Sequence, residues 1–168
     1  MPRTQSESTW QTYIGHRREL VGYARSLVKD AALAEDAVHD AVLEVAQSRT
    51  PKHDLKAYLF RAVRNRALRL LSRNGRETRA ANDHFTDLLE PKQADSDVVQ
   101  EENAKRVVQQ LARVGQDERE VIFLHLYGDL KFREIAALMD TPLGTVTARY
   151  RRGLEKLANN LEMSTHET

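Results

Sequence analysis

The chain has 168 residues, enough for one ordinary domain or two small ones. It contains no cysteine, which excludes a disulfide framework and thiolate chemistry. Basic and acidic residues nearly balance at a net charge of +1, so the total charge says little about partners.

The distribution of charge says more than the total. Residues 30–47 carry five acids and no lysine or arginine, residues 55–80 carry eight basic residues against one acid, and residues 81–102 carry seven acids against one lysine. Such blocks predict separate surfaces with separate partners. Few glycines and prolines and 6% aromatic residues predict an all-α fold. Because no apolar run approaches a membrane span and no signal peptide begins the chain, we expect a cytoplasmic protein with no membrane contact.

The first helical pattern begins at about Trp10, after a polar stretch that we expect to be frayed. Asp30 can cap a second helix, whose apolar stripe runs from Ala34 to Val45. The other side of that helix is acidic, with Leu43 among the acids. It is either a solvated face with one exposed apolar residue or a docking face for a basic partner protein, and the spacing leaves both open.

A third helix is predicted from Leu55 to about Arg73, capped by Asp54 after a loop over Ser48–His53. Its outward side presents polar and aromatic residues, namely Tyr58, Arg61, Arg64, Asn65, Leu68 and Ser72. Arginines interleaved with an aromatic ring and an asparagine suit a phosphate backbone and unstacked bases. With no glutamate at i+4 to offset them, the arginines repel one another unless an anion binds, so we favour nucleic acid over a solvated basic helix.

Residues 74–100 are polar, acidic and weakly periodic, and we interpret them as a linker with one short helical turn around Phe85 to Leu89. A second module is predicted from about Glu101 to Leu161. Within it, Asp117 to Glu120 open a helix that ends near Gly128, and a disordered tail follows from Glu162.

Lys131 to Leu157 predict a helix-turn-helix. Thr141 is placed to cap the second helix, and Pro142 then falls at its first position, where a missing N–H costs nothing. One stripe of this helix is apolar (Val146, Tyr150, Leu154, Leu157), and the other face offers Thr145, Arg149, Arg151 and Arg152. Hydroxyl and guanidinium groups contact base edges and phosphates in the major groove, so we favour DNA binding over a plain helical hairpin.

Two separated stretches resemble the bacterial RNA polymerase sigma factors, in particular the extracytoplasmic-function (ECF) group. AEDAVHDAVLEVA followed by KAYLFRAVRNRALRLLSR is similar to the second domain of that family. DEREVIFLHLYGDLKFREIAALMDTPLGTVTARYRRGLEKL is similar to its fourth domain. The resemblance implies two small helical domains, over residues 10–76 and 101–161, joined by an acidic linker over 77–100. The implied function is promoter-directed initiation with core RNA polymerase, and the family is often held inactive by an anti-sigma factor.

The resemblance also implies roles for particular positions. The polymerase-docking positions are Asp36, His39, Asp40 and Leu43. The positions that capture and melt the −10 element are Tyr58, Arg61, Arg64 and Asn65. The positions that read the −35 element are Thr145, Thr147, Arg149, Arg151 and Arg152.

Several departures from the family pattern are visible, among them His39 in place of a common glutamine. Lys131 replaces a serine cap, which predicts loss of the capping box with Glu134. Asp140 replaces a turn glycine, and aspartate tolerates a positive φ better than most residues do. Gly128-Asp129 inverts the usual order of acid and glycine, and Thr147 stands where a lysine is common.

Other classes of protein fit the sequence less well. The six histidines are scattered without a partner at metal-ligand spacing, and no glycine-rich phosphate loop is present. We therefore expect no catalytic residues, no metal and no cofactor. A helix-turn-helix regulator of the LuxR type would not need the acidic face or the arginine cluster of the first module. A sigma mimic that acts only through protein contacts would use the same fold without touching DNA.

Overall fold

The computed structural model describes residues 4–48, 54–74 and 98–166. These residues form seven α-helices and one short π-helical segment, with no strand among them, so the all-α prediction is confirmed. None of the helices in the described ranges is long and apolar enough to cross a membrane. The predicted linker up to residue 97, its helical turn at Phe85 to Leu89, and residues 49–53 of the predicted loop lie outside this part of the chain.

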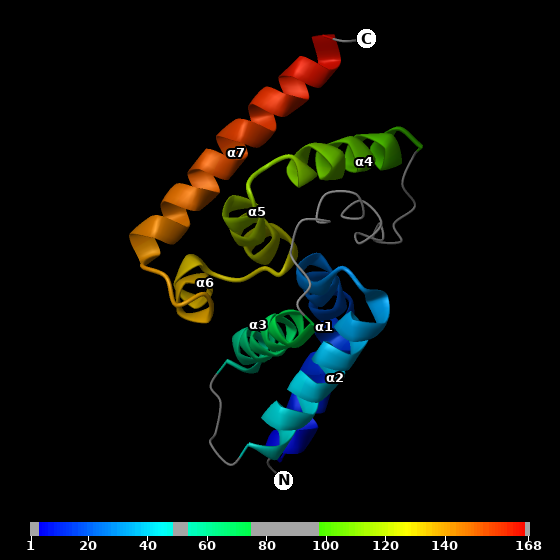
Figure 1. Cartoon of the computed structure of the whole chain (residues 1–168), viewed down its shortest axis with the longest axis vertical. Coiled ribbons are helices and arrows are strands. Elements are labelled where there is room, and N and C mark those ends of the chain that lie inside the picture. Colours follow the sequence, from blue (N-terminus) through cyan, green and yellow to red (C-terminus); the bar gives the residue numbers. More distant parts are fainter. Residues whose placement is uncertain (1–3, 49–53, 75–97, 167–168) are drawn as a thin grey trace.

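Three helices that pack against one another make up the N-terminal half (Figure 1): α1 (Gln5–Val28), α2 (Ala31–Gln47) and α3 (Leu55–Asn74). Their shared core is fully buried and includes Leu20, Tyr23, Val38, Leu59 and Phe60. Side-chain caps fix where two of these helices begin. The Asp30 carboxylate accepts the Leu33 N–H at 3.1 Å, and the Asp54 carboxylate accepts the Ala57 N–H at 3.2 Å, as the sequence predicts.

The start of α1 differs from the prediction. Residues 5–9 are helical, because Thr4 and Glu7 form a capping box that begins the helix before Trp10. The Thr4 hydroxyl accepts the Glu7 N–H at 3.2 Å, and the Glu7 carboxylate accepts the Thr4 N–H at 3.1 Å. The polarity of this stretch therefore reflects a cap and a solvated face.

The second half contains the other elements: α4 (Val98–Ala112), α5 (Gln116–Ile122), the π-helical segment η3 (Phe123–Tyr127), α6 (Phe132–Leu138) and α7 (Leu143–His166). Its core includes Val121, Leu124, Ile135 and Val146, all fully buried. The predicted helix end near Gly128 is confirmed. The predicted disordered tail is wrong up to His166, because α7 continues to that residue.

The helix-turn-helix is formed by α6 and α7, and the turn between them differs in detail from the prediction. Asp140 takes the left-handed conformation at φ 49°, as a glycine would. Thr141 does not hold the cap position, because its hydroxyl donates to the Met139 carbonyl at 3.0 Å and α7 begins one residue later than expected. The Pro142 carbonyl then accepts the first helical N–H, from Val146 at 3.1 Å.

Half of the capping box of α6 survives the replacement of serine by lysine. The Glu134 carboxylate accepts the Lys131 N–H at 2.9 Å, so the predicted loss is only partial. Lysine has no acceptor to return the bond, and the other half of the box is absent.

The two halves are in contact along one side of each. Figure 1 shows the second half lying over α1 and α3, and residues of α3 meet α6 while residues of α1 meet η3. The helix-turn-helix is thereby held next to the basic helix α3.

Candidate nucleic-acid interface

The N-terminal part of α7 carries the residues predicted to read duplex DNA. Val146 is fully buried in the core of the second half, and Tyr150 is partly buried against it, so the predicted inward stripe is confirmed. Thr145, Arg149 and Arg152 lie on the side that faces the start of α5. Together with residues 115–118 they line an open groove of about 330 Å³.

Acidic residues of α5 pair with the basic residues of this groove. Arg149 lies 3.8 Å from the Asp117 carboxylate, and Arg152 lies 3.7 Å from that of Glu118. Lys156 approaches Glu118 most closely, at 2.8 Å. Because Arg152 and Lys156 remain about half exposed, these ion pairs are weak enough for a phosphate to displace the carboxylates.

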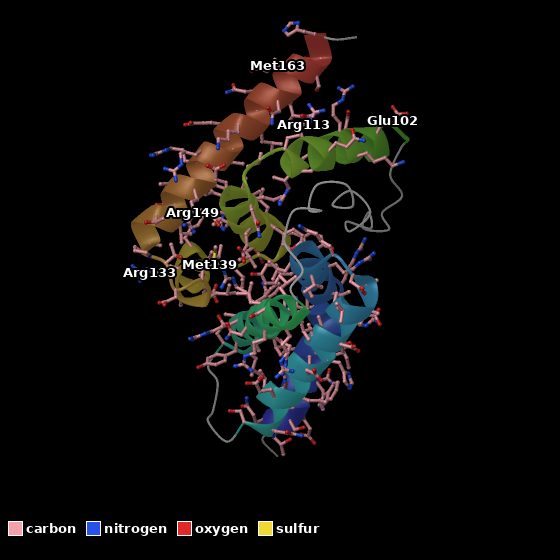
Figure 2. All side chains as sticks on the ribbon, in the orientation of Figure 1. Glu102, Arg113, Arg133, Met139, Arg149 and Met163 are labelled. Atoms are coloured by element: carbon pink, nitrogen blue, oxygen red, sulfur yellow. The ribbon has the colours of Figure 1, made fainter. Side chains whose placement is uncertain are left out.

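The five predicted −35 residues do not form a single cluster. Thr147 and Arg151 are exposed outside this groove, and the Thr147 hydroxyl donates to the Gly144 carbonyl at 3.1 Å. Figure 2 shows Arg149 on α7 with Arg133 on the neighbouring helix α6. The sequence reading missed Lys156, although it lies four residues after Arg152 and therefore on the same helical face.

A second groove, also of about 330 Å³, lies where α3 passes the end of α2. It is lined by three of the four predicted −10 residues, Tyr58, Arg61 and Asn65, together with Glu44, Val45, Ser48 and Ala62. Tyr58 is 38% exposed, so part of its side chain is accessible to a ligand in this groove. The contributions of α2 were missed because they come from the other side of the loop.

The fourth predicted −10 residue points elsewhere. The Arg64 Nε donates to the Glu120 carboxylate of α5 at 2.8 Å, and its side chain is only 20% exposed. Neighbouring residues on a helix are rotated by about 100° from each other, so the Arg64 side chain points away from the groove that Asn65 lines.

The predicted docking residues lie together on the solvent side of α2. Asp36, His39 and Asp40 are exposed, and Leu43 is half-buried. Asp40 lies 3.8 Å from Arg66 of α3, and the His39 ring lies 6.5 Å from that of Trp10. Across the residues that the structure describes, no group of three histidine or acidic side chains could hold a metal ion.

Fold and site define an all-α protein of two helical halves, each carrying a groove lined by arginine and other polar side chains, one of them on a helix-turn-helix. The family description "Sigma-70 region 2" matches residues 12–77, and "Sigma-70, region 4" matches residues 104–157. The chain is 31% identical over 135 residues to the ECF RNA polymerase sigma factor RpoE of Cereibacter sphaeroides, a match that covers 78% of this chain and 74% of that protein. It is 29% identical over 153 residues to the ECF RNA polymerase sigma factor SigK of Mycobacterium ulcerans, with 85% and 80% covered.

The chain therefore belongs to the ECF group of RNA polymerase sigma factors, as the resemblance implies, and it is a transcription initiation factor. Sigma factors are not enzymes.

Two solved structures share the fold. The sigma factor RpoE, in complex with the anti-sigma factor NepR from Bartonella quintana, aligns with a TM-score of 0.67 at 23% identity, covering 93% of this chain and 98% of that chain. CnrH, in complex with the cytosolic domain of CnrY, aligns with a TM-score of 0.61 at 23% identity, covering 94% and 89%.

Proposed function

We propose that this chain binds core RNA polymerase and directs it to promoters by holding two DNA elements with its two halves. The observation that carries the proposal is the pair of grooves on separate helical modules, each lined by arginine and other polar side chains. The groove with an exposed aromatic ring suits unstacked bases, and the groove on the helix-turn-helix suits a closed duplex. In this proposal residues 10–76 and 101–161 act as separate domains joined by 77–100.

The −10 element is opened by binding. Tyr58, Arg61 and Asn65 capture bases that leave the stack, and this capture offsets the few kcal/mol that each unstacked base costs. Thr145, Thr147, Arg149, Arg151 and Arg152 hold the −35 duplex through hydroxyl and guanidinium groups. No covalent step is required of the chain.

The exposed acidic face of α2, with Asp36, His39, Asp40 and Leu43, is the proposed polymerase contact. An exposed acidic surface fits a basic partner through charge complementarity, which raises the association rate and the specificity. We also propose that a protein of the anti-sigma type binds this chain, because one of the solved structures described above is a complex with an anti-sigma factor.

Run-off transcription tests the proposal most directly. Purified chain is added to core polymerase on a library of bacterial promoter fragments, and transcripts are mapped. The proposal expects defined start sites that need both core enzyme and this chain. A dimeric regulator of the LuxR type would instead bind a palindromic site alone, and a sigma mimic would bind protein partners without giving a transcript.

A further inference from the structure

A buried polar cluster joins the two halves of the chain. The Tyr23 hydroxyl on α1 donates to one carboxylate oxygen of Glu120 on α5 at 2.5 Å. The Arg64 Nε on α3 donates to the same oxygen at 2.8 Å. Tyr23 is fully buried and Glu120 is 8% exposed, so this carboxylate of the second half is held almost without solvent by donors of the first half.

Aromatic rings pack around this cluster. The Tyr23 ring stacks on Phe123 of η3, with centroids 6.0 Å apart and an interplanar angle of 23°, and it also contacts Phe60 at 5.7 Å. Gly128 brings the backbone of the second half against the same surface. A Cβ at this position would lie 3.4 Å from the Phe60 ring and 2.8 Å from the Leu124 carbonyl oxygen. The contact is therefore shaped as closely as a protein core.

The rim of the contact is polar. The Lys56 ammonium donates to the Asp129 carbonyl at 3.0 Å, so the start of α3 is tied to the turn before α6. Lys56 is two residues from Tyr58 of the first groove, and Asp129 is three residues from the start of α6. The two halves that carry the candidate DNA grooves are consequently tied together in this form of the protein.

The hydrogen bonds of this cluster form only when the two halves are in contact, and they can break when the halves separate. A buried carboxylate must be paired, and removing one partner of a buried pair is strongly destabilising because the remaining charge is uncompensated. Burial, and then the neighbouring Glu120 carboxylate, raises the pKa of the Tyr23 phenol well above its usual value, so the phenol remains a donor. When the halves separate, water can hydrate Glu120 and Arg64, as it does at interfaces between domains that move.

The closed form cannot occupy both promoter elements. Elements centred at −35 and −10 are about 25 base pairs apart, which corresponds to about 85 Å of B-form duplex at about 3.4 Å per base pair. Residues 75–97 join the halves. Because a fully extended peptide of that length reaches about 80 Å, its length permits the halves to move far apart. The two halves, which are tied together through Lys56 and Asp129, must therefore move apart before one chain holds both elements.

We propose that Tyr23, Glu120 and Arg64 form an intramolecular latch that keeps the free chain closed and opens when the chain holds a promoter with core polymerase. The need for opening rests on the function proposed above, whereas the latch itself is a property of the free protein. Closing also engages Arg64 of the basic helix α3, so the latch withdraws one basic group from that surface.

The latch can be tested by a distance measurement on the free chain. The natural sequence has no cysteine, so Ala32→Cys on α2 and Ala158→Cys on α7, both at exposed positions, accept one spin label each without a background signal. Double electron–electron resonance should show one narrow distance population for the otherwise unchanged chain. Adding Glu120→Gln should raise the long-distance fraction by about tenfold or more, because the neutral amide loses the negative charge that pairs with Arg64 and strengthens the bond from the Tyr23 hydroxyl.

Matched variants keep the test decisive. Glu155→Gln removes the same charge from an exposed position of α7 and should leave the distances unchanged. Tyr23→Phe keeps the ring and removes only the hydroxyl, so it serves if Glu120→Gln fails to fold by circular dichroism, and it should also raise the long-distance fraction. Identical distance distributions for the unchanged chain and the folded latch variants would overturn the latch.

The final arm separates the latch from the proposed function. Adding core polymerase and an active promoter fragment should lengthen the label distance by tens of ångströms. If run-off transcription never occurs while Glu120→Gln still opens the free chain, the promoter function fails and the latch stands. If transcription occurs but the distance in the promoter complex stays short, opening on the promoter is refuted.

Discussion

At the scale of single residues, the α7 groove is defined by ion pairs between acidic and basic side chains. The carboxylates of Asp117 and Glu118 pair with Arg149, Arg152 and Lys156, and the proposed function requires a phosphate to replace them. We expect Arg149→Ala to weaken binding to a −35 duplex by about 1–3 kcal/mol if the guanidinium contacts a base. Fluorescence anisotropy at fixed salt measures this change. Asn159→Ala, on an exposed position of the same helix, is the control, and equal affinities for both variants would remove Arg149 from the reading surface.

Replacing Gly128 by alanine should lower the stability of the fold measurably. An added methyl group would press on the Leu124 carbonyl at 2.8 Å, and backbone there cannot yield as a flexible side chain can. Gly128→Ala should therefore lower the free energy of unfolding by about 1–3 kcal/mol. Gly144→Ala is the matched control, because nothing lies within 4 Å of its Cβ and alanine favours the helix. Urea denaturation of both variants decides, and a Gly128→Ala protein as stable as the original would contradict this account.

Some of these residues could be predicted from the sequence, and others could not. Asp30 and Asp54 are caps, and a cap depends only on the next three residues, which the sequence displays. Arg64 was grouped with Asn65 because both are polar on one helix. Its partner Glu120 lies 56 residues away, and no local pattern reports such a contact.

At the scale of elements, helix starts control the arrangement of the N-terminal half. Asp30→Ala should lower the free energy of unfolding by about 0.5–2 kcal/mol, since the Leu33 N–H loses its acceptor at the start of α2. Asp30→Asn keeps a side-chain oxygen and should recover most of the loss. Thermal unfolding followed by circular dichroism compares the three proteins, and equal losses for alanine and asparagine would show that capping is not the cause.

The first residues of α3 and α6 bring two carboxyl groups together across the contact between the halves. The hydrogen bond between the Glu134 carboxyl and the Asp54 carboxylate, followed by burial, raises the pKa of Glu134, and the same hydrogen bond lowers the pKa of Asp54. Lys56 and Lys131 are the cations that face this pair. The contribution of Glu134 to closing is present below its ordinary pKa and is lost as pH rises through the raised value. That of Asp54 is present above its ordinary pKa and is lost as pH falls through the lowered value.

The closed fraction should therefore gain from this pair when the pH falls from neutral towards the raised pKa of Glu134. The spin-label distances report the closed fraction across the titration. Glu134→Gln cannot share a titrating proton with Asp54, so the difference between this variant and the unchanged chain isolates the pair from other titrating groups. Parallel pH profiles for the two proteins would exclude a role for the pair.

Elements were predicted well where the pattern was regular. The stripes of α2 and α7 stand in the sequence at helical spacing and are confirmed. The start of α1 was missed because Thr4 and Glu7 were taken for part of a polar tail, although their spacing is that of a capping box. The turn before α7 was shifted by one residue, since the Thr141 hydroxyl can donate backwards as easily as it can cap.

At the scale of the whole molecule, the proposed partner surface lies on α2, away from the residues of the latch. Asp40→Arg should reduce association with core polymerase by at least about tenfold, because reversing a charge at a complementary interface creates repulsion. The fold should survive, since Asp40 is about half exposed. Co-elution with core enzyme measures the loss, and Glu155→Arg on α7 is the control. Normal assembly of the Asp40→Arg holoenzyme would argue against this docking face.

The arrangement of the two halves could not be predicted from the sequence. Each half follows from its own apolar periodicity, but their contact depends on Tyr23, Phe60 and Glu120, which are far apart in the chain and carry no mutual spacing. For the same reason, the sequence predicted only some of the residues that line each groove. The residues on one helix were found, and those contributed by a second helix were not.

The engagement of Arg64 beneath Glu120 bears on how the protein behaves in a crowded nucleoid. A chromosome offers on the order of a million or more unspecific sites, and each unshielded cation on a small protein increases retention there. A closed chain that conceals one guanidinium would spend less time adsorbed along irrelevant duplex. More copies would then stay free to meet polymerase, and occupancy of promoters would follow the supply of enzyme instead of the abundance of genomic DNA.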